Sequence, residues 1–192
     1  MPKDYPLPIL AFVAYSGTGK TTLLEALLPL LRAQGLRVSY IKHSHHQLDL
    51  DQPGKDSYRL RQAGAAQVIL ASAKRWALMQ ETADAGHEPD LHTLVNKLDP
   101  ALCDLVLVEG FKHQALPKIE CLRQAHLQQR AAEPIYRHDP QVIALACDRD
   151  YREETPIPKL DLNQPAQIVR FIIDWLAQQQ DQQTASYHEE TS

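Results

Sequence analysis

A glycine-rich segment near the N-terminus has the residue types and spacing of a phosphate-binding loop: residues 14–22 read AYSGTGKTT. Glycines let successive backbone N–H groups turn toward one anion, and a helix that begins where such a loop ends adds the partial positive charge of its N-terminus. At this spacing Lys20 reaches the β- and γ-phosphates of a nucleoside triphosphate, and the Thr21 hydroxyl ligates Mg²⁺. The segment therefore predicts a site for a nucleoside triphosphate and Mg²⁺.

The segments on either side of this loop support the prediction. An apolar run over residues 9–13 precedes it, and leucines at helical spacing follow over residues 23–31, so a strand and a helix flank the glycines. Ala14 replaces the first glycine of the usual G-x-x-x-x-G-K-S/T pattern, at a position that needs only a small side chain. A glycine-rich turn before an ordinary helix is the alternative, and the strand-to-helix context disfavours it. The residues predicted to contact the phosphates are Ser16, Gly17, Thr18, Gly19, Lys20, Thr21 and Thr22.

A phosphate loop of this kind also needs a carboxylate on a neighbouring strand. Asp104 begins an apolar run that ends at Glu109, so Glu109 lies at the ligand end of the predicted strand and Asp104 at the far end, where it is expected to be structural. Glu109 can hold Mg²⁺ through water or orient the attacking water, and Gly110 lets the backbone approach the γ-phosphate. We predict Lys20 and Glu109 as the catalytic residues, the alternative for Glu109 being a solvent-exposed acid.

Residues 42–51, KHSHHQLDLD, hold three histidines and two aspartates after another predicted strand. Imidazoles and carboxylates suit Zn²⁺ or Ni²⁺, but the two-residue period of an extended chain sends adjacent histidines apart. We favour a nucleotide or substrate loop in which Lys42 neutralises phosphate and either Asp49 or Asp51 reaches Mg²⁺; of these two we select Asp49. A plain polar loop is the remaining alternative.

Two segments are candidates for binding a guanine base. Residues 96–99, NKLD, match the N-K-x-D signature of many GTPases, but here they end a predicted helix and precede the Glu109 strand, so the topology argues against that function. Asp148 follows a predicted buried strand over residues 141–147, and its carboxylate can accept the N1 and N2 hydrogens of guanine. We therefore predict Asp148 as the base-contacting residue.

Strands and helices alternate along the chain, which predicts an α/β fold of the P-loop NTPase type, with a mostly parallel sheet and helices on both faces. Two adjacent strands over residues 67–72 and 75–81 predict an antiparallel hairpin added to it. We expect one nucleotide-binding domain over residues 1–177 and a polar, disordered tail over residues 178–192. The other predicted strands cover residues 9–14, 36–42, 104–108, 118–123 and 141–147, and the predicted helices cover 20–34, 55–64, 90–98 and 165–180.

Composition excludes several classes of function. A net charge of −4 gives no basic footprint for nucleic acid, and prolines and charges interrupt every long apolar stretch, so no membrane span is expected. The three cysteines are widely spaced without a C-x-x-C pair, which predicts buried free thiols. Such thiols and a polar N-terminus favour a cytoplasmic protein.

Five motifs in this order resemble the MobB family, the molybdopterin-guanine dinucleotide biosynthesis adapter proteins. They are the loop over residues 14–22, the histidines over 43–46, PGKDS over 53–57, GAA over 64–66 and VEGFK over 108–112, and the resemblance covers about residues 7–175. It implies a cytoplasmic homodimer that binds GTP with Mg²⁺ and hydrolyses it weakly. It also implies partnership with the guanylyltransferase MobA, which joins GMP to molybdopterin, and makes molybdopterin a further candidate ligand. The phosphate-loop residues of the family fall on Gly17, Gly19, Lys20, Thr21 and Thr22, and its Walker B-like residues on Glu109 and Gly110.

The residues themselves offer a reason for weak hydrolysis, since no glutamine stands beside Gly110 and no arginine is identifiable as a finger. Two other functions stay open. A small-molecule P-loop kinase needs a lid with arginines, for which Arg123, Arg130 and Arg137 are candidates. A metal-delivery GTPase is suggested by the histidine loop.

Overall fold

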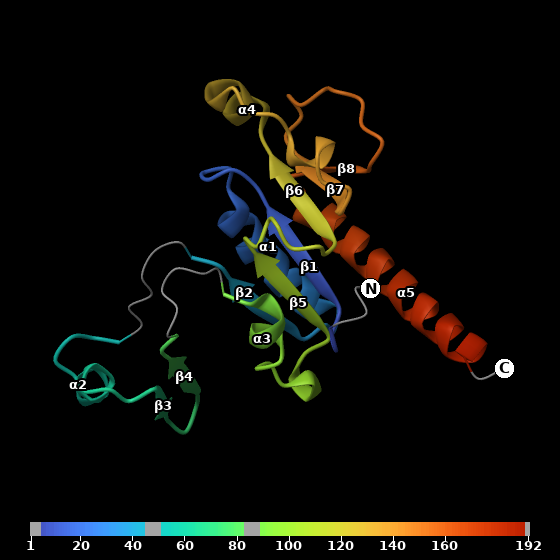
Figure 1. The fold of residues 1–192 in the computed structure, drawn as a ribbon. Coiled ribbons are helices and arrows are strands. Elements are labelled where there is room, and N and C mark those ends of the chain that lie inside the picture. Colours follow the sequence, from blue (N-terminus) through green and yellow to red (C-terminus); the bar gives the residue numbers. More distant parts are fainter. Residues whose placement is uncertain (1–4, 45–50, 83–88, 191–192) are drawn as a thin grey trace. The chain divides into compact units, whose positions relative to one another are not determined.

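The chain forms two compact units (Figure 1), Met1–His43 with Asp90–Ser192, and Ser44–Pro89. The computed structural model describes residues 5–44, 51–82 and 89–190, the last nine of them by backbone alone. The sequence favoured a single nucleotide-binding domain over residues 1–177. In the structure the segment Ser44–Pro89, which follows the second strand, is compact by itself, and the assignment of residues 1–177 to one nucleotide-binding domain stays a prediction.

The larger unit is built on a six-stranded sheet in the order β2-β5-β1-β6-β7-β8, in which every pair of neighbours is parallel. Strand β1 lies inside the sheet between β5 and β6, so the segments that follow these three strands all leave the same edge. Strand register places Glu109 opposite both Phe12 of β1 and Lys42 of β2. The strands are β1 (Ile9–Val13), β2 (Val38–Lys42), β5 (Leu105–Glu109), β6 (Lys118–Leu122), β7 (Val142–Cys147) and β8 (Lys159–Asp161).

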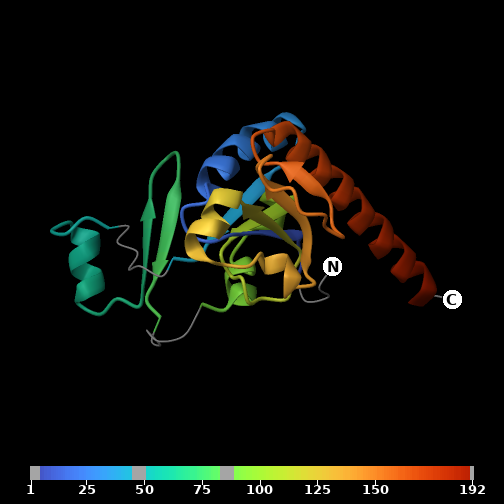
Figure 2. The same ribbon diagram turned by 90° about the horizontal axis from the view of Figure 1, so that it is seen from above.

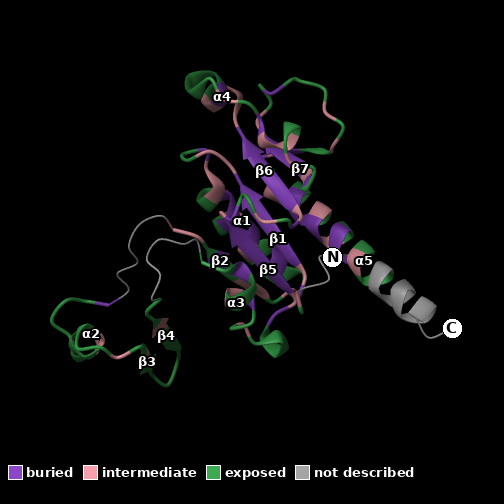
Figure 3. Cartoon of the chain, viewed as in Figure 1, coloured by how far each residue is buried: buried purple, intermediate pink, exposed green. Residues whose placement is uncertain are grey.

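Helices cover both faces of this sheet, as predicted (Figure 2). Helices α1 (Lys20–Ala33) and α5 (Pro165–Glu190) pack together on one face. There they bury side chains such as Leu10 and Phe12 of β1, while Ile9 and Val13 point to the opposite face with α3 (Leu91–Val95). Both faces of β1 are therefore buried, which explains its uninterrupted apolar sequence (Figure 3).

Shorter elements complete the larger unit. Helix α4 (Gln124–Arg130) and the 3₁₀ turn η2 (Ile135–Arg137) occupy the stretch after β6, and the 3₁₀ turn η1 (Pro100–Leu102) precedes β5. None of the helices in the described part of the chain has the length and apolar content needed to cross a bilayer. The three cysteines are buried and unpaired, as predicted, and burial raises the pKa of the Cys121 thiol to about 12.

Helix α5 continues to Glu190, well into the segment 178–192 for which the sequence favoured a fraying helix followed by disorder. Gln is the most abundant residue there, and it has good helix propensity. The boundary that we placed at residue 177 therefore does not coincide with the end of the helix.

The smaller unit contains α2 (Asp56–Gln62) and the antiparallel pair β3 (Gln67–Ala71) and β4 (Trp76–Gln80). The predicted hairpin is confirmed, but it forms a two-stranded sheet of its own and does not extend the parallel sheet. Its apolar side chains are unusually open to solvent: Ile69, Leu70, Trp76 and Leu78 of the hairpin and Leu60 of α2 are all exposed.

Candidate functional site

The predicted phosphate loop connects β1 to α1 at the carboxyl edge of the sheet. Its backbone is left-handed at Gly17 (φ 84°) and Gly19 (φ 99°) but not at Ala14, so the alanine does not disturb the loop. Gly19 caps α1, and among the described residues no side chain accepts the helix's first N–H groups. The first turn of α1 also carries no acidic residue. This end of α1 is therefore electrically suited to an anion.

The side chains of the loop have different surroundings. Lys20 is partly buried and its Nζ lies 3.5 Å from the carbonyl oxygen of Ala14, which keeps the ammonium group beside the loop. Thr18 is buried, and its hydroxyl donates to the carbonyl of Tyr15 at 2.7 Å, so this side chain stabilises the loop itself. Thr21 and Thr22 are exposed at the start of α1, where their hydroxyls are accessible to a ligand.

Glu109 ends β5 beside the phosphate-loop strand and is almost completely buried, with 7% of its surface exposed. Its carboxylate accepts a hydrogen bond from the Tyr40 hydroxyl and lies 3.8 Å from the Lys42 ammonium group. Burial and this hydrogen bond raise the pKa of Tyr40, so the phenol stays protonated and acts as a donor. The carboxylate is thus held by two side chains from β2.

Tyr40 was missed by sequence analysis, and Lys42 was assigned to a phosphate. In the structure Lys42 pairs with Glu109, and a phosphate contact by its ammonium group stays a prediction. Both residues lie on β2 next to β5, two positions apart and hence on the same side of the strand. One signal in the sequence could have identified Tyr40. It is the combination of an acidic residue at the end of one strand with a Tyr-x-Lys pattern on the neighbouring strand.

Gly110 follows Glu109 in the left-handed conformation, with φ 95°. A Cβ atom at this position would lie 2.9 Å from the Cβ of His43, so glycine is required by packing as well as by backbone conformation. The His43 ring also packs against the ring of Phe111, with 4.9 Å between centroids. The predicted approach of the Gly110 backbone to a γ-phosphate is compatible with this packing but is not needed to explain the glycine.

Asp148 follows β7, and its Oδ1 accepts the backbone N–H of Gln124 at 3.2 Å. One carboxylate oxygen therefore holds the start of α4, and the predicted pairing with guanine stays a prediction. The competing NKLD segment has a structural explanation. Asn96 ends α3, and the side chain of Asp99 accepts the N–H of Ala101 at 2.8 Å to cap η1.

Of the Mg²⁺ ligands proposed from the sequence, some lie within the described residues and others do not. Thr21 and Glu109 offer a hydroxyl and a carboxylate at the same edge of the sheet, which fits a cation that prefers oxygen ligands and keeps several waters. Asp49, His45 and His46 lie outside the described residues. Within those residues, no group of three His, Cys, Asp or Glu side chains is positioned to hold a metal ion.

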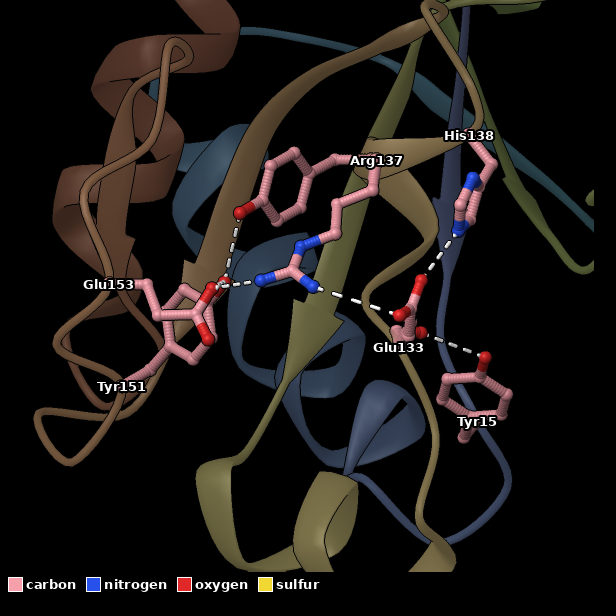
Figure 4. A network of polar contacts seen from close by, with 7 residues as sticks. Tyr15, Glu133, Arg137, His138, Tyr151 and Glu153 are labelled. Atoms are coloured by element: carbon pink, nitrogen blue, oxygen red, sulfur yellow. Dashed lines mark hydrogen bonds and ion pairs between the residues drawn. The ribbon is translucent and has the colours of Figure 1, made fainter.

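Side chains from the segment after β6 contact the phosphate loop, although the sequence analysis considered them only as the lid arginines of a kinase. Arg123 donates through Nε to the carbonyl of Thr18, and Arg130 donates through Nη2 to the carbonyl of Ser16, both at 3.1 Å. Arg137, the third candidate, turns away to Glu153 at 2.6 Å (Figure 4). Arg130 ends α4, and Arg123 stands directly before its first residue. The two arginines are separated by about two helical turns, which is the signal available in the sequence.

Comparison with known proteins gives a consistent result. Residues 9–148 match the family model described as molybdopterin guanine dinucleotide synthesis protein B, or MobB. The chain is 47% identical over 173 residues to the molybdopterin-guanine dinucleotide biosynthesis adapter protein of Escherichia coli K12, covering 90% of this chain and 95% of the relative. It is 46% identical over 170 residues to the protein of the same name from Haemophilus influenzae, covering 88% and 90%. The crystal structure of Bacillus subtilis MobB superposes with a TM-score of 0.68 at 25% identity, covering 88% of this chain and 97% of that one.

Proposed function

The chain belongs to the MobB family, and we propose that it is a GTP-binding adapter that assists the attachment of GMP to molybdopterin. The names of the relatives from Escherichia coli and Haemophilus influenzae support the adapter function, and their likeness extends over about nine-tenths of the chain. The single observation that carries the nucleotide part is the loop itself. Two left-handed glycines lead directly into α1, whose first N–H groups have no side-chain cap among the described residues.

The nucleotide would be held by residues from several strand ends. In this proposal Lys20 binds the β- and γ-phosphates, Thr22 contacts the inner phosphates, and Thr21 and Glu109 hold Mg²⁺ directly or through water. Asp148 pairs with the base. Mg²⁺ supplies charge neutralisation at the phosphates, while Tyr40 keeps the Glu109 carboxylate oriented toward its ligand.

Hydrolysis of GTP by this chain is proposed to be slow. The residues that flank Gly110 are Glu109 and Phe111, so no glutamine is placed there to orient water. Phosphoryl transfer depends on positioning and charge stabilisation, and an enzyme that lacks one of these groups loses orders of magnitude in rate. Turnover of many GTP molecules per second by the isolated protein would contradict this proposal.

We also propose that the protein is a cytoplasmic homodimer and that the smaller unit supplies the interface. A lone two-stranded sheet is marginally stable in water, and the exposed side chains of Ile69, Trp76 and Leu78 form an apolar surface on it. In a twofold interface the same surface of both subunits is in contact, so the apolar surface of one hairpin would pack against the identical surface of a second copy. Sedimentation of the protein and of a Trp76→Asp variant tests this, since the proposal expects a dimer that becomes monomeric on substitution.

The adapter function is tested by reconstitution with MobA, molybdopterin and GTP. We expect the unaltered protein to be retained by immobilised MobA and to increase the yield of the guanine dinucleotide cofactor. A Lys20→Ala variant should still bind MobA but give no increase, because the nucleotide site is lost. If immobilised MobA retains the protein but the yield of the guanine dinucleotide cofactor does not rise, the protein is only a binding module. If the protein releases nucleoside diphosphate only when a small-molecule phosphate acceptor is present, it is a kinase.

A further inference from the structure

The segment from Arg123 to Glu133, here called the lid segment, is attached to the phosphate loop by three hydrogen bonds (Figure 4 shows the one made by Tyr15). Besides the contacts of Arg123 with Thr18 and of Arg130 with Ser16, the Tyr15 hydroxyl donates to the carbonyl of Glu133 at 2.9 Å. These contacts join residues more than a hundred positions apart in the sequence. The lid segment therefore lies on the loop that binds the phosphates.

Arg123 is the residue of this segment best placed for a ligand. Its side chain is partly buried, and its Nη2 lies 3.9 Å from where a Cβ of Gly19 would be, so the guanidinium group rests over the last glycine of the loop. Among the described residues its hydrogen bond to Thr18 uses Nε alone. The two Nη groups therefore remain for an acceptor on the side of the loop where the phosphates bind.

His126 provides a second and independent observation. Its Cε1 lies 3.1 Å from where a Cβ of Gly17 would be, so the imidazole also packs on the loop. Its Nδ1 is inaccessible to solvent and has no hydrogen-bond partner in the described part of the chain. A buried polar nitrogen without a partner is costly, and an incoming phosphate oxygen would satisfy it.

The charges explain why a phosphate would compete for these side chains. Arg123 now donates to a neutral backbone carbonyl, whereas a guanidinium group forms stronger, bidentate hydrogen bonds with phosphate. Lys20 and Arg130 lie beside the same loop, so the site carries several positive charges for a ligand with three phosphates. Fully ionised GTP carries more negative charge than GDP, and the terminal phosphate is the group by which the two nucleotides differ.

We propose that Arg123 is a binding residue for the terminal phosphate, supplied by the chain's own lid segment and supported by His126. The proposal rests on the proposed GTP-binding function and deepens it. The lid segment discriminates the triphosphate from the diphosphate, because only the triphosphate reaches the guanidinium group. Asp148 connects this discrimination to the base site, since its carboxylate holds the N-terminus of α4.

The test compares the binding of a non-hydrolysable GTP analogue with that of GDP, by calorimetry with Mg²⁺. Arg123→Ala should weaken the analogue about tenfold, which corresponds to about 1.4 kcal/mol, and leave GDP within about twofold. Arg123→Lys keeps the charge without the planar fork and should give an intermediate loss. Arg170→Ala, an exposed arginine on α5, is the matched control and should change neither affinity.

Two results would overturn the inference. An equal loss of affinity for the analogue and for GDP would show that Arg123 only stabilises the loop, and an unchanged affinity for both would show no contact. Thermal unfolding of each variant identifies any that has failed to fold, in which case Arg123→Lys carries the test. If the unaltered protein binds neither nucleotide, the proposed function fails, and this result is distinct from failure of the lid.

Discussion

Substitution of Gly110 by alanine is predicted to destabilise the fold by two separable effects. An L-residue in the left-handed region costs roughly 1–2 kcal/mol, and the new Cβ would stand 2.9 Å from the Cβ of His43, a distance that requires atoms to move. Overpacking of this kind typically adds about 1–3 kcal/mol. Gly35→Ala is the matched control, because Gly35 has φ 84° and a Cβ there would meet nothing within 4 Å.

The assay is urea unfolding of both variants, with the free energies of unfolding compared. We expect Gly110→Ala to cost about 1–3 kcal/mol more than Gly35→Ala, the difference being the contact with His43. In a His43→Gly background the excess should disappear, whereas His43→Ala retains the Cβ and should retain the excess. Equal costs for the two glycines, or an excess that survives His43→Gly, would refute this explanation of Gly110.

Three further predictions concern charged and polar groups. Tyr40→Phe removes the donor to Glu109 and should cost about 1–3 kcal/mol of stability. Because the pKa of Tyr40 is raised in the folded protein, its contribution is complete below the unfolded pKa of about 10 and is lost as pH rises through the folded value. An alkaline titration of tyrosinate absorbance should therefore lose one of its late steps in the variant, while the late step of Tyr151, whose pKa is also raised, remains. Lys118→Ala leaves Asp139 without its cation in a largely buried pair 2.8 Å apart, and chemical denaturation should show a loss of about 3 kcal/mol. Asp148→Asn keeps an acceptor for the α4 N–H but removes the carboxylate for guanine, so affinity for GTP should fall at least about tenfold and affinity for xanthosine triphosphate should rise.

Each of these predictions has a result that contradicts it. Loss of an early step from the titration of Tyr40→Phe, with every late step kept, would show that the pKa of this phenol is not raised. For Lys118 the control is Arg149→Ala, whose exposed ion pair with Asp161 should contribute less than about 1 kcal/mol, and equal losses would exclude the burial argument. Asp148→Asn with an unchanged preference for GTP would remove Asp148 from the base site.

The sequence predicted those features that depend on residues close together in the chain. The phosphate loop follows from glycines and Lys-Thr within nine residues, and the burial of β1 and β5 follows from short apolar runs. The position of Glu109 followed as well, because the end of a buried strand is recognisable without knowing its neighbours. Topology then excluded the NKLD segment, and the cap made by Asp99 agrees with that exclusion.

Contacts between distant segments were not predictable in the same way. The bond from Tyr40 to Glu109 joins two strands 69 positions apart, and the bond from Arg123 to Thr18 spans 105 positions. A single sequence shows charged residues in each segment but not which of them meet. The sequence also did not show that β3 and β4 form a separate two-stranded sheet. Alternation of apolar and polar residues predicts a strand but does not show which sheet the strand joins.

The central claim is that the loop over residues 14–22 binds GTP, and calorimetry with Mg²⁺ tests it most directly. We predict clear binding of GTP, weaker binding of ATP, and loss of both in a Lys20→Ala variant of unchanged thermal stability. Tighter binding of ATP than of GTP, or binding that survives Lys20→Ala, would contradict the account.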